Sequence, residues 1–86
     1  MKKIIGIIKP FEMQQSLIVY EDGNKIDICE TTLSDLMENL FPLMEKHQVY
    51  KLDLVGPKKY LKGFTDQIQE KARTKYQNNQ IEINII

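Results

Sequence analysis

Four lysines, in two separate parts of the chain, have the spacing that best fits an anion site. Lys9 follows an apolar run near the N-terminus, and Lys58, Lys59 and Lys62 follow a Gly-Pro pair where a second apolar run gives way to a helical pattern. The first N–H groups of a helix lack intrahelical partners and lie at the positive end of the helix dipole, so they attract the same anions as lysines do. Tyr60 lies among these lysines and could stack on a base. The sequence therefore nominates Lys9, Lys58, Lys59, Lys62 and Tyr60 as candidate anion-binding residues.

The same residues also fit a purely structural interpretation. Lysines between a strand and a helix are commonly solvated, and Tyr60 and Phe64 fall on the apolar stripe of the expected helix. The sequence has no glycine-rich phosphate loop of the GxxxxGK[ST] type. Both interpretations stay open at this point.

His47 and Cys29 are each the only residue of their type. His47 falls near the end of an expected helix, which favours a capping or partly buried structural role, and it has no visible partner for a zinc site. Cys29 alternates with its neighbours so that it faces away from Ile28, which predicts a packed thiol. A lone cysteine forms no internal disulfide and indicates a reducing compartment, so the expected location is the cytoplasm.

The acidic residues expected on strands are Asp27, Glu30 and Asp53. They form no pair at a spacing typical of acid–base catalysis. Asp53 is expected on an inner strand, where Lys51 on the same face is its predicted partner. The sequence thus predicts no catalytic residues, no metal site and no cofactor.

The bulk composition is that of one ordinary globular domain covering residues 1–86. Apolar residues make up 42% and charged residues 28%, with 12 basic and 12 acidic side chains and a net charge of zero. The apolar run Ile4–Ile8 is far shorter than the roughly 20 residues that cross a bilayer, and no cleavage site follows it, so neither a membrane association nor export is expected. The preference for lysine over arginine is typical of an AT-rich bacterial or mobile-element genome.

Two kinds of periodicity define the expected elements. Apolar runs or strict alternation predict strands, and apolar spacings of three and four predict helices. The expected strands are Lys3–Lys9, Gln15–Glu21, Lys25–Glu30, Val49–Val55 and Ile81–Ile86. The expected helices run from Leu33 to His47, and from about Lys58 or Phe64 to Tyr76.

Three details sharpen this assignment. The continuous run Lys3–Lys9 predicts a strand covered on both faces. Asp22-Gly23-Asn24 predicts a tight hairpin turn, and Thr32 with Asp35 resembles a helix capping box. Pro42 lies inside the first helical pattern and predicts a kink or break just before it.

The element order is β-β-β-α-β-α-β, an α/β class with a single mixed five-stranded sheet. A meander followed by two right-handed crossovers predicts the strand order 3-2-1-4-5, with both helices on one face. In such sheets ligands bind beyond the carboxyl ends of strands where the order reverses, here between the first and fourth strands.

This order and the opening residues Ile4–Lys9 resemble the ribonuclease H-like superfamily, particularly its small Holliday-junction-resolvase type. The family's first strand reads apolar-Gly-apolar-Asp-x-Gly, and Gly6 matches its first glycine. The family's metal-binding Asp would fall at Ile8 and its second glycine near Pro10. An aliphatic side chain cannot hold Mg²⁺. The resemblance therefore implies the fold without the nuclease mechanism.

The expected function is a non-catalytic binding module that recognises a protein or a nucleic acid, and a bacterial mobile element is its expected source. The alternative is a small enzyme or sensor that binds a phosphorylated small molecule between the first and fourth strands. The last strand, at a sheet edge with Ile81, Ile83 and Ile85 on one face, is expected to mediate any homodimer.

Overall fold

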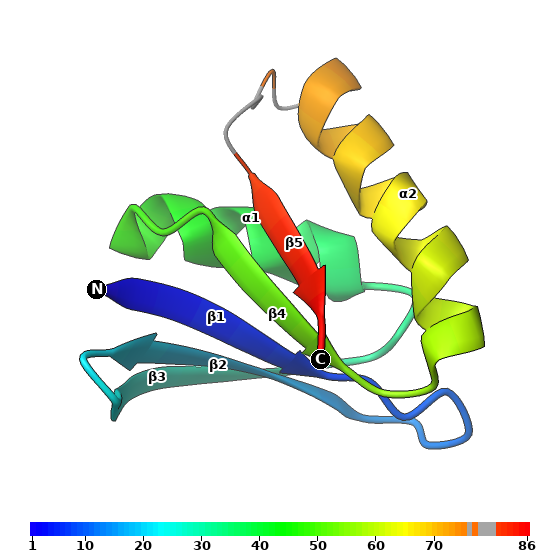
Figure 1. Ribbon diagram of the computed structural model, residues 1–86, viewed down its shortest axis with the longest axis horizontal. Coiled ribbons are helices and arrows are strands. Elements are labelled where there is room, and N and C mark those ends of the chain that lie inside the picture. Colours follow the sequence, from blue (N-terminus) through cyan, green and yellow to red (C-terminus); the bar gives the residue numbers. More distant parts are fainter. Residues whose placement is uncertain (76, 78–80) are drawn as a thin grey trace.

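The computed structural model describes residues 1–75, 77 and 81–86, and these form one sheet with two helices packed against it (Figure 1). The described elements are β1 (Lys2–Ile7), β2 (Gln15–Glu21), β3 (Asn24–Thr31), α1 (Leu36–His47), β4 (Lys51–Val55), α2 (Lys58–Thr74) and β5 (Glu82–Ile85). The strand order is β3-β2-β1-β4-β5. Strands β1, β2 and β3 pair antiparallel, whereas β4 pairs parallel with both β1 and β5. The predicted mixed five-stranded sheet is therefore confirmed.

The β2–β3 hairpin has the turn that its sequence predicts. Asp22 and Gly23 have φ angles of 52° and 85°. Two successive positive φ values give a two-residue turn whose twist matches that of the flanking strands. The turn sets the pairing of Tyr20 with Lys25, and a bulge between Val19 and Tyr20 then shifts the register so that Leu17 lies opposite Cys29.

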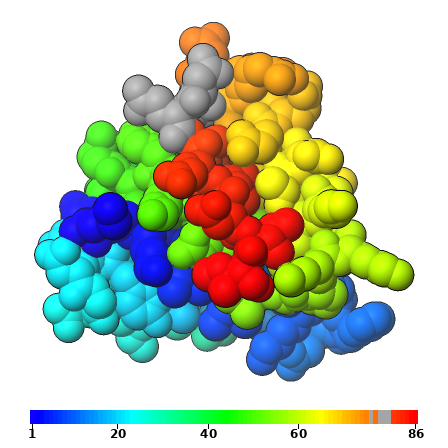
Figure 2. Space-filling model, viewed as in Figure 1, coloured from blue at the N-terminus to red at the C-terminus, as the bar shows by residue number. Residues whose placement is uncertain are grey.

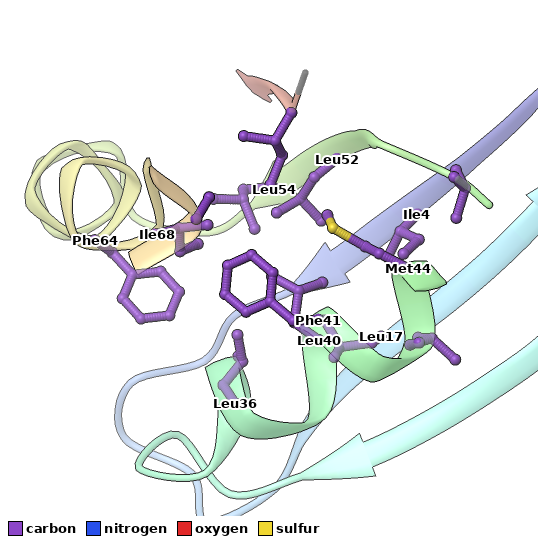
Figure 3. Close-up of a cluster of buried hydrophobic side chains, with 14 of the residues drawn as sticks. Ile4, Leu17, Leu36, Leu40, Phe41, Met44, Leu52, Leu54, Phe64 and Ile68 are labelled. Carbon is purple, nitrogen blue, oxygen red and sulfur yellow. The ribbon is translucent and has the colours of Figure 1, made fainter. Parts of the chain in front are cut away.

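Both helices cover the same face of the sheet, as two right-handed crossovers in one direction require. Alternate residues of β1, β2 and β4 face the helices and are fully buried, as Ile4, Leu17 and Leu52 show. In Figure 3, Phe64 and Ile68 of α2 point toward the side chains of α1 on the same face of the sheet. One hydrophobic core thus holds the described part of the chain together.

The opposite face of the sheet has no helix over it among the described residues. Its apolar side chains are half-buried or exposed, and none of them belongs to the core. We call this surface the open face; its apolar residues are Ile5, Ile7, Ile18, Tyr20, Ile28 and Val55. The prediction that β1 is covered on both faces was therefore wrong. Isoleucine and other β-branched residues favour a strand when only one of its faces is covered, so a run of isoleucines does not require a second layer.

Of the kink or break predicted at Pro42, the break does not occur. Helix α1 runs without interruption from Leu36 to His47 with Pro42 inside it. Proline in a helix interior loses a hydrogen bond and crowds the preceding turn, at a cost of about 3 kcal/mol, and burial of Leu40, Phe41 and Leu43 outweighs that cost.

Element ends differ from prediction by a few residues. Helix α1 begins at Leu36 and not at Leu33, after a turn in which the Thr32 hydroxyl accepts a hydrogen bond from the Asp35 N–H at 3.3 Å. Strand β4 begins at Lys51 and β5 spans Glu82–Ile85. The predicted end of the second helix at Tyr76 lies outside the described residues, as does the predicted loop at positions 78–80.

Candidate anion-binding site

Three of the nominated lysines surround one cavity. Lys58, Lys59 and Lys62 at the start of α2, together with Ile85 of β5, line a cavity of about 350 Å³. We call it the lysine pocket. Figure 2 shows the start of α2 (yellow-green) beside the end of β5 (red) on the molecular surface. The pocket combines lysine side chains with an apolar isoleucine, a combination that suits a ligand with both an anionic and a nonpolar part.

The pocket lies at the positive end of a helix. Pro57 is the N-cap residue and supplies no side-chain hydrogen bond, and the Leu61 N–H is bonded to the Pro57 carbonyl at 3.0 Å. The preceding N–H groups of Lys58, Lys59 and Tyr60 have no intrahelical acceptor. The first turn of α2 contains no acidic residue. Lysines at this end oppose the helix dipole, which costs about 0.3–1 kcal/mol for each charge in the first turn.

The pocket lysines also lack the ion pairs that several other cations of the chain make. Within the described residues, no salt bridge involves Lys58, Lys59 or Lys62. Side-chain cations elsewhere do form ion pairs with carboxylates, namely Lys2, Lys3, Lys9, Lys46 and Arg73. An anion entering the pocket would therefore meet lysines that no described carboxylate already holds in an ion pair.

Gly56 sets the position of the pocket relative to β1. A β-carbon at Gly56 would lie 2.6 Å from the backbone oxygen of Ile8, closer than atoms can approach. The Ile8 N–H is bonded to the Val55 carbonyl at 2.8 Å. The end of β1 and the loop into α2 thus pack against each other, and only glycine permits that approach.

Lys9 lies at the same end of the sheet but does not line the pocket. Its ammonium is 3.5 Å from the carboxylate of Glu12. The buried side chain of Gln15 closes this loop by accepting a hydrogen bond from the Lys9 N–H and donating to the carbonyls of Lys9 and Glu12. Lys9 is thus held apart from the lysine pocket, which lies between α2 and β5.

The position of Tyr60 agrees in part with the anion-binding interpretation and in part with the structural one. Its ring stacks on Phe64 with centroids 5.8 Å apart and planes at 25°. Phe64 is buried, whereas Tyr60 is 37% exposed and lies outside the lining of the lysine pocket. Tyr60 therefore extends the core outward and leaves one aromatic surface available beside the lysines.

His47 and Asp27 form a separate charged cluster at the other helix. The His47 Nε2 lies 2.8 Å from an Asp27 carboxylate oxygen, and the Lys46 ammonium lies 3.3 Å from the same oxygen. The hydrogen bond with His47, together with those from the Ile28 N–H and Lys46, lowers the pKa of Asp27 to about 2. His47 is half-buried, as its position in the sequence predicts. Sequence reasoning missed this cluster because Asp27 and His47 come together only through the fold.

Asp53 and Cys29 make contacts that fit structural roles. Asp53 is 7% exposed and lies 3.4 Å from the Lys3 ammonium on β1. The predicted partner Lys51 was wrong, since the neighbouring parallel strand brings Lys3 closer than the residue two positions away on β4. Cys29 packs partly against the core, away from the exposed Ile28.

Over residues 1–75, 77 and 81–86, no group of three or more potential ligands is placed to hold a metal ion. No helix in the same ranges has the length and apolarity needed to cross a membrane.

Comparison with known proteins identifies the fold. No family model and no curated protein matches the sequence. The chain is similar in structure to a protein of unknown function with an actin-like ATPase fold from Bacteroides thetaiotaomicron VPI-5482, with a TM-score of 0.70 and 11% sequence identity. The match covers 99% of this chain and 32% of that protein, so this chain spans about a third of its length. The actin-like fold is a relative of the ribonuclease H-like superfamily, and at this identity the likeness establishes the fold alone: the chain has a ribonuclease H-like fold.

Proposed function

We propose that the chain is a non-catalytic binding module of a bacterial mobile element and that its macromolecular partner, a nucleic acid or a protein, is recognised at the lysine pocket. The observation that carries this proposal is the convergence of Lys58, Lys59 and Lys62 on one cavity at a helix N-terminus. The free chain gains no ion pair from these lysines in its described part and bears the cost of placing them against the helix dipole. Binding a phosphate converts that cost into a favourable interaction.

A nucleic acid is the partner that the surroundings of the pocket favour. The exposed part of Tyr60 lies in the same helical turn as Lys58 and Lys59. Stacking of a base on an aromatic ring contributes about 1–3 kcal/mol, and neighbouring lysines hold the phosphates on either side. A single strand offers unstacked bases for this purpose, so a single-stranded oligonucleotide is the first ligand to test.

The test is fluorescence anisotropy with a labelled single-stranded oligonucleotide over a range of salt concentrations. Three phosphate contacts predict a slope of about −2 for the logarithm of the association constant against the logarithm of salt concentration. Lys62→Gln should reduce that slope by about 0.7, whereas the control Lys71→Gln, in the last turn of the same helix, should leave it unchanged. Equal losses in the two variants would contradict recognition at the pocket.

The alternative, a small enzyme or sensor for a phosphorylated small molecule, is favoured by the volume of about 350 Å³ and the apolar wall of Ile85. Cavities of roughly 300–1,000 Å³ are typical of small-ligand sites. A thermal-shift series with nucleotides and sugar phosphates tests it, because a ligand at 100 times its dissociation constant adds about 2.7 kcal/mol of stability. No shift with any of these compounds would remove this alternative and leave the macromolecular proposal in place.

Within the ribonuclease H-like superfamily, we place the chain nearest the small Holliday-junction-resolvase type, supported by the β-β-β-α-β-α-β order and by Gly6 in the first strand. The proposal includes no nuclease chemistry, since buried Ile8 occupies the position of the family's metal-binding Asp. It also places the chain in the cytoplasm, supported by the free thiol of Cys29.

A further inference from the structure

We propose that the open face binds a second copy of this chain, sheet against sheet, in a two-fold symmetric dimer. Helices α1 and α2 both lie on the other side, and among the described residues the aliphatic side chains of the open face are neither in the core nor packed against it. Ile28 is 47% exposed and Val55 37%. A contiguous apolar surface of this kind is typical of an interface.

The open face has polar residues at both ends of an apolar centre. Strand pairing arranges its residues in three rows across β3, β2 and β1, and each row is defined by residues that lie opposite one another. One outer row is Lys25, Tyr20 and Lys3; the central row is Ile28, Ile18 and Ile5; the other outer row is Glu30, Ser16 and Ile7. The two ends of edge strand β3 therefore carry opposite charges on this face.

This arrangement is complementary to itself. A two-fold axis parallel to the central row reverses the strand direction of the second copy. The central row then lies on its own equivalent, and Lys25 of one copy lies over Glu30 of the other, twice in each dimer. Such mutual contacts between identical patches characterise two-fold dimers, and aligned sheets pack about 10 Å apart.

The charges elsewhere permit this contact. The net charge of zero means that two copies do not repel each other overall. Asp53 extends the central row onto β4 and would face its equivalent, but it is 7% exposed and paired with Lys3. Four strands and three rows give a face of roughly 20 Å by 20 Å, the low end of interface size, so we expect a micromolar dimer.

The open face is a better surface for self-association than β5, the strand expected from the sequence to mediate a homodimer. Ile81 is 8% exposed, and Ile83 and Ile85 pack partly against the core. Their side chains are occupied within the described chain, whereas those of Ile28 and Val55 are not. The apolar residue that follows β5, Ile86, is 62% exposed.

The first experiment is sedimentation equilibrium of the full chain at protein concentrations up to about 500 µM, where a micromolar dimer is populated. Ile18→Glu places a charge at the centre of the open face and should weaken the dimer by at least 100-fold. Ile86→Glu makes the same chemical change at the end of β5 and should leave the dimer unchanged. Thermal unfolding of both variants checks that they are folded, which is expected because neither side chain belongs to the core.

The second experiment exchanges the charges. Lys25→Glu and Glu30→Lys should each weaken the dimer about tenfold or more, because each brings two pairs of like charges together. The double variant restores opposite charges and should dimerise as the wild type does. An equimolar mixture of the two single variants should form a mixed dimer, in which every pair is again opposite.

These experiments separate the possible outcomes. A wild-type chain that stays monomeric at every concentration overturns the proposal. A dimer that survives Ile18→Glu but not Ile86→Glu assigns self-association to β5 and also overturns it. A dimer that Ile18→Glu abolishes, without rescue in the double variant and the mixture, contradicts the two-fold arrangement of Lys25 over Glu30.

Discussion

The cations at the C-terminal end of α1 and those at the N-terminal end of α2 interact with the helix dipole in opposite ways. At the C-terminal end of α1, Lys46 and His47 lie at the negative end of the helix dipole and share the carboxylate of Asp27. At the N-terminal end of α2, Lys58 and Lys59 lie at the positive end without an acidic residue in the first turn. The first arrangement stabilises the fold. The second lowers the stability of the free chain, which is typical of a site that has a ligand.

Breaking the geometry of the lysine pocket should have the largest effect. Gly56→Val places side-chain atoms against the Ile8 backbone oxygen, so we expect the free energy of unfolding to fall by about 1–3 kcal/mol. Urea denaturation measures this change. Gly63→Ala is the matched control, because a β-carbon there has no neighbour within 4 Å and should stabilise α2 by about 0.5–1 kcal/mol. Equal effects of both substitutions would show that the contact between Gly56 and Ile8 does not position the loop.

Breaking the Asp27 cluster should have a smaller, pH-dependent effect. The pKa of Asp27 is lowered from 3.8 to about 2, so the folded state stabilises the carboxylate relative to the unfolded chain. That stability is fully present above about pH 4 and is lost as the pH falls toward 2. Asp27→Asn should therefore lower the melting temperature by a few degrees at pH 6, and the difference from wild type should disappear near pH 2. A difference independent of pH would assign the effect to packing.

Reversing charge at the two ends of α2 should give the smallest changes in stability, and these should have opposite signs. Lys58→Glu should raise the free energy of unfolding by about 0.3–1 kcal/mol, because it places an acid at the positive end of the dipole. Lys71→Glu, in the last turn, should lower it by a similar amount. Lys58→Glu should also weaken oligonucleotide binding. A variant that loses both stability and binding would argue that Lys58 has a structural role.

The sequence predicted the fold well because its strongest signals are local. Asp22-Gly23-Asn24 fixes one hairpin, and the three-and-four spacing of apolar residues from Leu36 to Met44 fixes one helix. The handedness of crossovers then leaves few possible sheets. The interruption expected at Pro42 did not occur, since tertiary packing of its neighbours outweighed the preference of proline itself.

The candidate site was predictable in composition but not in geometry. The lysines of the α2 N-terminus are adjacent in sequence, so their proximity needed only the helix. The contribution of Ile85 depends on the pairing of β5 with β4, and Lys9 is held in its own loop by Glu12 and Gln15. Contacts between distant segments, such as Asp27 with His47 and Lys3 with Asp53, leave no periodic signal in the sequence.

The parallel pairing of β1 with β4 has a consequence for how the chain folds during its synthesis. Ile4 pairs with Leu52, so the central strand must wait until more than half of the chain has left the ribosome. Until then only the β1–β2–β3 meander and α1, which precede β4 in the chain, can form. Closing so long a loop is slow, and we therefore expect the docking of β4 to limit the folding rate. During that interval chaperones would find their most accessible binding segment in the isoleucines of the first strand.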